Sequence, residues 1–253
     1  MCAEKRKVIL PESALYYRSY NSKLSPLDSD NQLLPTLVRT KVNGCVCYVA
    51  ENSESNRVFH SVSNILRLTQ AERTKKALEQ WEEKVGKAEA KRIRDQAIRA
   101  GNIVHSYFHS YITEGRTQDV GKAYEPYLEA LNQLLPNFEE QFLSEQFVVS
   151  FKYRYFGRID QFGLYRGSLT LSDLKTALKP KHSINWVQDK ILQLAAYYIP
   201  IEALYPVEQA ALIYLISDGS YNEFLFTPKQ METYKELWLE KVLQVNEMLS
   251  FAA

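Results

Sequence analysis

The chain has 253 residues, 45% of them hydrophobic and 24% charged, which is typical of a globular protein that buries its own core. A formal net charge of +1 excludes a polycation that binds nucleic acid through bulk charge, and three cysteines without framework spacing exclude a disulfide scaffold and indicate a reducing, cytoplasmic compartment. Residues 1–10 lack the apolar core of a signal peptide, and the longest apolar run, 210–216, is too short to span a membrane, so we expect no membrane partner.

The first 140 residues are expected to contain a short region of strands followed mainly by helices. After a loop-like stretch at 25–35, residues 36–50 are predicted to form two short strands around Asn43-Gly44, a dipeptide that favours a tight turn. The spacing of apolar residues then predicts three helical segments: residues 61–68, 70–114 and 119–135. Ser61 or Ser63 would cap the first helix, and Pro136 ends the last.

The second half alternates strands and helices. We expect strands over five segments: residues 142–149, 153–164, 169–176, 210–216 and 221–226. A long helix over 183–204 separates the third strand from the fourth, and Thr227 would cap a final helix over 228–249. This order predicts an α/β or α+β fold, in which helices flank a mixed central sheet and a helical elaboration precedes it.

The strand expected over 169–176 carries charged residues on a face that begins apolar. Side chains alternate between the faces of a strand, so Asp173 and Lys175 share a face with two leucines. Charges beside a core are costly unless they are paired or bind a metal. Asp160 lies on the preceding strand, and two carboxylates held close together favour a cation such as Mg²⁺ or Mn²⁺. The alternative is a salt-bridged hairpin in which Lys175 neutralises one aspartate.

Four short motifs occur in the order and spacing of a known nuclease family. They are Gly101-Asn102-Ile103-Val104-His105, Gly157-Arg158-Ile159-Asp160, Asp173-Leu174-Lys175, and Gln193 with Tyr197. Through them, residues 60–215 resemble the PD-(D/E)XK nuclease superfamily and, within it, the RecB-like exonucleases. The most similar group is that of the mitochondrial genome maintenance exonuclease and its bacterial and phage relatives. The first 55 residues lie outside the resemblance.

The resemblance implies a restriction-endonuclease-like fold in one compact domain with three parts. Residues 1–60 would be an N-terminal extension with short strands, residues 61–140 a helical elaboration that carries His105, and residues 141–253 the nuclease core.

The resemblance also implies roles for individual residues. The implied catalytic residues are Asp160, Asp173, Lys175 and Gln193. The implied metal ligands are His105, Asp160, Asp173 and the backbone carbonyl of Leu174. Glu145 and Tyr197 are further candidates for the site. The candidate DNA contacts are basic or aromatic: Lys91, Arg94, Lys179, Lys181 and Trp186.

Ordinary structural roles stay open as alternatives for several of these residues. His105 lies on the apolar stripe of its helix, where a histidine often packs in the core. Tyr197 could serve helix packing alone. Lys91 and Arg94 alternate with acidic residues, which is typical of a solvated helix face.

We therefore expect a monomeric, Mg²⁺- or Mn²⁺-dependent exonuclease that cleaves single-stranded DNA from a free end, in a bacterial or phage-infected cell or, after removal of a transit peptide, in an organellar matrix. No iron–sulfur cluster is expected, because none of the three cysteines flanks the motifs. No nucleotide cofactor is expected, because residues 115–122 lack the spacing of a phosphate-binding loop. The alternatives are a duplex-end exonuclease or an endonuclease of the same superfamily, and an inactive relative that binds nucleic acid.

Overall fold

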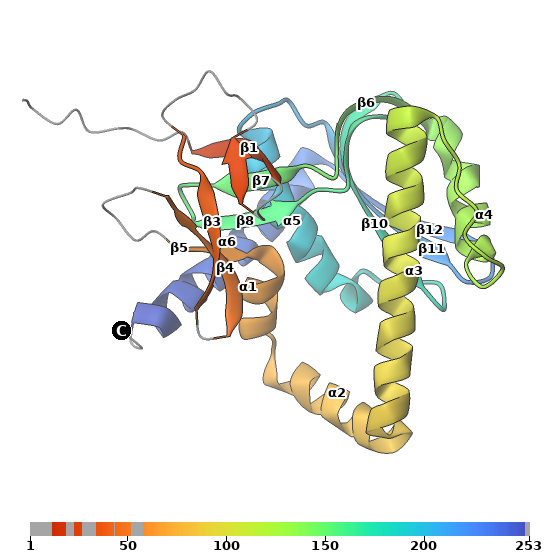
Figure 1. The fold of residues 1–253 in the computed structure, drawn as a ribbon, viewed down its shortest axis with the longest axis horizontal. Coiled ribbons are helices and arrows are strands. Elements are labelled where there is room, and N and C mark those ends of the chain that lie inside the picture. The colour runs from red at the N-terminus through yellow and green to blue at the C-terminus, as the bar shows by residue number, and fades with distance from the viewer. Residues whose placement is uncertain (1–11, 19–22, 27–33, 43, 52–57, 251–253) are drawn as a thin grey trace, which may run out of the picture.

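The strands form two sheets between which the chain passes more than once. The computed structural model describes residues 12–18, 23–26, 34–42, 44–51 and 58–250. Within these ranges, one sheet is a closed barrel with the strand order β1-β2-β3-β4-β5-β8-β7, and the other has five strands in the order β12-β11-β10-β9-β6 (Figure 1).

Each sheet combines strands from separate parts of the chain. The barrel contains β1 (Ser13–Arg18), β2 (Leu24–Pro26), β3 (Leu37–Val42), β4 (Cys45–Ala50), β5 (Val58–Ser61), β7 (Phe147–Ser150) and β8 (Tyr155–Arg158). The second sheet contains β6 (Phe138–Ser144), β9 (Gln161–Tyr165), β10 (Ser168–Ala177), β11 (Gln209–Ile216) and β12 (Tyr221–Phe226). The helices are α1 (Val62–Leu68), α2 (Glu72–Val85), α3 (Lys87–Glu114), α4 (Glu125–Leu134), α5 (Gln188–Glu202) and α6 (Pro228–Ser250), with short 3-10 turns at Leu135–Asn137 and Ile184–Trp186.

The prediction of a restriction-endonuclease-like fold, built on one helix-flanked sheet, is wrong. A closed barrel accompanies the second sheet, and it takes five strands from the first 61 residues and two from the second half. Parallel pairing of β5 with β8 and antiparallel pairing of β1 with β7 close the barrel. These partners are far apart along the chain, and pairing over such distances leaves no local sequence pattern.

Two of the predicted strands are wrong in the same way: each covers parts of two strands, one in the barrel and one in the second sheet. The segment 142–149 divides into β6 of the second sheet and β7 of the barrel, at Glu145, whose φ of 54° is uncommon for a residue other than glycine. The segment 153–164 divides into β8 and β9 immediately before Gln161. The chain therefore crosses between the sheets once on each side of the β7–β8 hairpin.

The remaining elements agree with the sequence patterns more closely. The hairpin within 36–50 is β3 and β4, although Asn43 and part of the loop at 25–35 lie outside the described residues. The prediction of one helix over 70–114 is wrong in one respect, because Gly86, with φ 85°, divides this segment into α2 and α3. Capping of α1 by Ser61 is confirmed, since its hydroxyl accepts a hydrogen bond from the backbone N–H of Asn64 at 3.2 Å.

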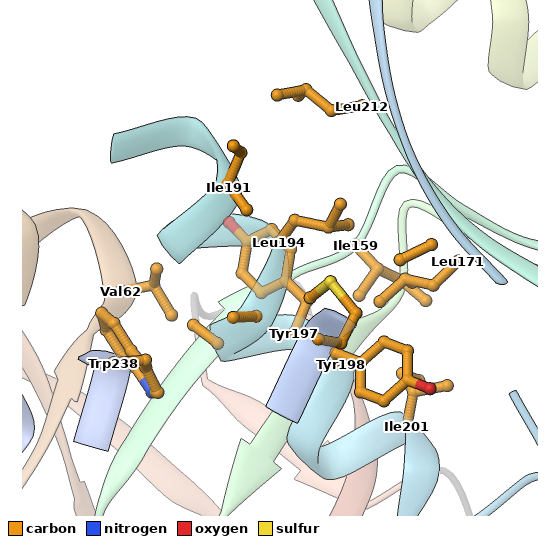
Figure 2. Packing of buried hydrophobic residues seen from close by; sticks show 14 of the residues in the cluster. Val62, Ile159, Leu171, Ile191, Leu194, Tyr197, Tyr198, Ile201, Leu212 and Trp238 are labelled. Carbon is orange, nitrogen blue, oxygen red and sulfur yellow. The ribbon is translucent and has the colours of Figure 1, made fainter. Parts of the chain in front are cut away.

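Helices pack on both faces of the second sheet, and this packing positions β10. Leu171 belongs to the apolar cluster formed with α5 and α6, which contains Leu194 and Trp238 (Figure 2). Leu174 belongs to the opposite cluster, with α3 and α4. The predicted alternation along β10 is thus confirmed, and burial of each such leucine stabilises the fold by about 1.5–3 kcal/mol.

None of the helices within the described ranges combines the length and the apolar character needed to cross a lipid bilayer.

Candidate metal site and active cleft

The two crossings between the sheets lie side by side and bring two carboxylates together. The backbone N–H of Glu145 donates to the carbonyl oxygen of Asp160 at 3.0 Å, and that of Ile159 donates to Gln146 at 2.9 Å. These bonds continue the β7–β8 pairing to the end of the hairpin. Glu145 and Asp160 therefore lie at the junction of the barrel and the second sheet.

His105 on α3 completes a cluster with these two carboxylates. Its Nδ1 lies 3.3 Å from an oxygen of Glu145 and 3.3 Å from an oxygen of Asp160. One ligand atom from each of the three residues lies within 4.8 Å of the other two, which is close enough for all three to hold one metal ion. We call His105, Glu145 and Asp160 the metal triad.

The other predicted residues on β10 surround this triad in different ways. The second oxygen of Asp160 accepts a hydrogen bond from the backbone N–H of Leu174 at 2.7 Å. Lys175 Nζ lies 2.5 Å from Asp173 Oδ2 and donates to the carbonyl oxygen of Leu174 at 3.3 Å. Asp173 is almost fully buried, at 1% exposed, and lies outside the metal triad. The structure thus places Lys175 and Leu174 beside Asp160, with Asp173 behind Lys175.

Burial and opposite charges compete at each ionisable group of the site. Burial raises the pKa of Asp173 to about 6, although the ammonium of Lys175 opposes this effect. Burial also raises the pKa of Asp160, but the charges of His105 and Lys175 outweigh it and hold this pKa below the ordinary value. Asp160 is therefore ionised at neutral pH.

The two basic groups of the site keep their protons when no metal is bound. Burial lowers the pKa of His105, but the Asp160 carboxylate outweighs burial, so that this pKa is raised to about 10. Burial likewise lowers the pKa of Lys175, and the carboxylates of Asp173 and Asp160 raise it above the ordinary value. A metal ion would therefore have to displace a proton from His105.

A cleft of about 380 Å³ opens onto the metal triad from the barrel side. His105, Asp160 and Lys175 line it together with Gln193 and Tyr197, the two residues predicted on α5. The side-chain N–H of Gln193 donates to the hydroxyl of Tyr197 at 2.9 Å, and Tyr197 is buried. Each of the four sequence motifs thus contributes at least one residue to this cleft.

The ring of Tyr197 packs so close to Gly157 that there is no room for a side chain at this position. A Cβ atom at Gly157 would lie 2.2 Å from Cε1 of Tyr197, whereas a Cβ at Gly101 would meet nothing within 4 Å. Gly157→Ala is expected to destabilise the protein by about 1–3 kcal/mol through overpacking. Gly101→Ala, in the middle of α3, is expected to stabilise it by about 0.5–1 kcal/mol. Urea denaturation of both variants measures the two effects, and a Gly157→Ala protein as stable as the wild type would contradict the steric role.

The candidate DNA contacts lie in two groups outside the cleft. In the segment that follows β10, Lys179 is exposed and Trp186 is 66% exposed, while the backbone N–H of Lys181 donates to Asn222 at 2.8 Å. On α3, Lys91 pairs with Asp95 at 2.5 Å, and Arg94 pairs with Glu82 of α2 at 2.9 Å. Arg94 therefore ties α2 to α3, and both cations already have carboxylate partners.

Arg158 is a residue of the site to which the sequence pattern assigned no role. Its Nε lies 3.0 Å from an oxygen of Glu145, whose other oxygen contacts His105. Arg158 lies within the motif that ends at Asp160. The motif does not show that this arginine pairs with Glu145, which lies on a different strand segment.

Comparison of the sequence with protein-family models and with curated proteins gives no match. Among solved structures, the chain is similar to one titled "Crystal structure of SSO0001", with 16% sequence identity, 77% of this chain and 79% of that chain covered, and a TM-score of 0.39. At this level of similarity, neither the fold nor the activity of that protein transfers to this chain.

Proposed function

We propose that the protein is a metal-dependent nuclease that hydrolyses phosphodiester bonds of DNA. The observation that carries the proposal is the meeting, at one cleft, of His105, Asp160 and Lys175, which belong to three separate motifs of the sequence. A cation site beside a lysine in the lining of a cleft is suited to hydrolysis of an anionic ester, because both groups can stabilise negative charge on the phosphate.

The metal triad suits a hard or borderline divalent cation. Two carboxylate oxygens favour Mg²⁺ or Mn²⁺, and the imidazole of His105 favours the transition metal Mn²⁺ over Mg²⁺. When bound, the ion would lower the pKa of a coordinated water and neutralise charge on the scissile phosphate.

The residues around the triad have separable tasks in this reaction. Asp160 and Glu145 would hold the cation, and Arg158 would orient Glu145. Lys175 is protonated at neutral pH, so it would stabilise the negative charge that develops on the phosphate, since a protonated amine cannot accept a proton. In the reaction the water oxygen would form a bond to phosphorus as the bond to the leaving oxygen breaks. The proton lost by the water would pass to solvent, and the leaving oxygen would take up a proton from solvent.

A preference for single-stranded DNA with a free end is part of the proposal, and it rests on the resemblance of the motifs and on the place of the helices. The helices α1 to α4 connect the barrel to the second sheet, and α2 with the adjoining half of α3 stands away from both sheets (Figure 1). If these helices cover the path to the cleft, a strand would reach the metal triad by its end. A reducing, cytoplasmic compartment is part of the same proposal, and it agrees with the free thiols of Cys45 and Cys47.

A nuclease assay with end-labelled DNA tests the proposal. We expect products from linear single strands with Mn²⁺, fewer with Mg²⁺ and none with EDTA. Circular single strands should resist cleavage. Equal cutting of circular strands would favour an endonuclease, and faster cutting of blunt duplexes would favour a duplex-end exonuclease. Binding of DNA without cleavage under every metal would leave the inactive relative as the correct reading.

Metal binding should release a proton, because His105 is protonated in the metal-free protein. At pH 7 we expect about one proton per Mn²⁺, and an affinity for Mn²⁺ that rises with pH up to about 10. Isothermal titration calorimetry in two buffers of different ionisation enthalpy measures the number of protons. His105→Gln should abolish the release. His109→Gln is the matched control, because His109 lies one turn along α3 and bonds Ser144 at 2.7 Å. Equal proton release by wild type and His105→Gln would contradict the site.

A further inference from the structure

The barrel contributes a wall to the active cleft, and this wall carries an exposed arginine. The cleft that contains Asp160 and Lys175 is also lined by Arg18, the last residue of β1. Arg18 lies in the part of the chain outside the family resemblance, so the sequence motifs assign it no role.

The strand pairing of the barrel holds Arg18 beside the metal triad. In the β1–β7 register Tyr16 pairs with Phe147, and the side-chain N–H of Gln146 donates to the carbonyl of Tyr16. Gln146 directly follows Glu145 of the triad. The end of β1 is thus tied to the crossing where the chain enters the barrel.

The guanidinium of Arg18 lies over an aromatic ring at the cleft and can donate hydrogen bonds to an anion. Its Cζ lies 4.8 Å from the centroid of the Phe147 ring, a distance typical of a cation–π contact. Stacking uses the flat face of a guanidinium and leaves the N–H groups on its edge to donate. Within the described part of the chain, no carboxylate lies at ion-pair distance from Arg18, whereas Arg158 and Lys175 in the same cleft have carboxylate partners.

We infer that Arg18 binds a phosphate of the substrate strand next to the scissile bond, so that the barrel forms the second wall of the DNA-binding cleft. The inference rests on the proposed nuclease function. A guanidinium donates two parallel hydrogen bonds to a phosphate, which positions the strand as well as attracting it. A volume of about 380 Å³ is that of a small-ligand site, so a strand that reaches the triad also comes within reach of this wall.

Arg18→Ala and Arg39→Ala form a matched pair for the test. Arg39 is also an exposed arginine of the barrel, on β3, and it does not line the cleft. Both variants lose one positive charge from the same sheet. Binding of a fluorescein-labelled oligothymidylate is measured by anisotropy in EDTA, and its cleavage is measured with Mn²⁺, each at several salt concentrations.

Arg18→Ala should weaken binding and raise KM by about tenfold, and leave kcat within a factor of about two. The slope of log affinity against log salt should fall by about 0.7, the value for one phosphate contact on a single strand. Arg18→Lys should lie between wild type and alanine, because it keeps the charge and loses the planar pair of donors. Arg39→Ala should match the wild type.

Two results would overturn the role of Arg18 while leaving the nuclease intact. One is an Arg18→Ala protein with the affinity and salt slope of Arg39→Ala. The other is a fall in kcat with unchanged KM and slope, which would indicate a distorted site. If wild type binds the strand and never cleaves it, the nuclease proposal fails, and the difference between the two variants still decides the role of Arg18. If wild type neither binds nor cleaves, both are overturned.

Discussion

Replacing Asp160 with asparagine is expected to lower kcat by roughly 1000-fold. Asp160 is the residue at which the contacts of the site meet, since one carboxylate oxygen contacts His105 and the other accepts the backbone N–H of Leu174. Asparagine keeps the size of the side chain and an oxygen that can accept the Leu174 hydrogen bond. It removes one of the two negative charges that would hold a cation, which leaves Glu145 as the one carboxylate of the triad.

Single-turnover cleavage and Mn²⁺ titration of Asp160→Asn measure the two consequences separately. We expect the affinity for Mn²⁺ to fall together with kcat, while single-strand binding in EDTA stays close to wild type. The melting temperature at pH 7 should also fall, because the charges of His105 and Lys175 favour the ionised form of Asp160. Asp189→Asn is the matched control, because Asp189 lies exposed at the start of α5, does not line the cleft, and should keep full activity. Retention of activity by Asp160→Asn would remove the residue from the proposed metal site.

Replacing Lys175 with methionine is expected to abolish cleavage and also to destabilise the protein by about 1–2 kcal/mol at pH 7, because an Asp173 with a pKa of about 6 can take up a proton when the ammonium is lost. The ammonium lies 2.5 Å from Asp173, and it also lowers the pKa of Asp160. Without it, the buried carboxylate of Asp173 would lose its ion-pair partner and keep only the weaker influence of the His105 charge. The loss of stability in Lys175→Met would come from the unpaired carboxylate of Asp173, so removing that carboxylate should restore the stability.

The double variant Asp173→Asn with Lys175→Met tests this cause. We expect it to be inactive and to recover most of the stability lost in Lys175→Met, as measured by urea denaturation at pH 7 in EDTA. Lys91→Met provides the control, because Lys91 forms an exposed ion pair of the same 2.5 Å length and its loss should change stability little. Equal instability of the double and the single variant would show that Lys175 contributes through packing.

The destabilisation by Lys175→Met should also depend on pH. In the wild type, the pKa of Asp173 is about 6 in the folded state, above its value near 3.9 in an unfolded chain. This group therefore contributes stability that is fully present below the unfolded value and is lost as the pH rises through about 6. Below that range Asp173 is neutral and needs no cation. The penalty of Lys175→Met should thus shrink as the pH falls from 7 to 5, and a penalty independent of pH would contradict this account.

The local patterns of the sequence predicted most elements but not their division between two sheets. Residues 142–149 and 153–164 each read as one strand, because no glycine or proline stands at either crossing to mark a break. Glu145 breaks the first strand through a left-handed backbone conformation, which its residue type does not indicate. The barrel was missed for a related reason, because its closure depends on pairing between β1 and β7 and between β5 and β8, far apart in the chain.

The sequence by itself indicated three charged residues of the cleft, Lys175 through strand alternation and His105 and Asp160 through the resemblance of their motifs, because alternation and motifs are local properties of a chain. The tertiary structure alone decided how these residues are used. It paired Asp173 with Lys175, joined Glu145 to the metal triad and brought Arg18 into the lining of the same cleft. Distances between side chains on different elements depend on how those elements pack, and a linear pattern of residues does not contain that information.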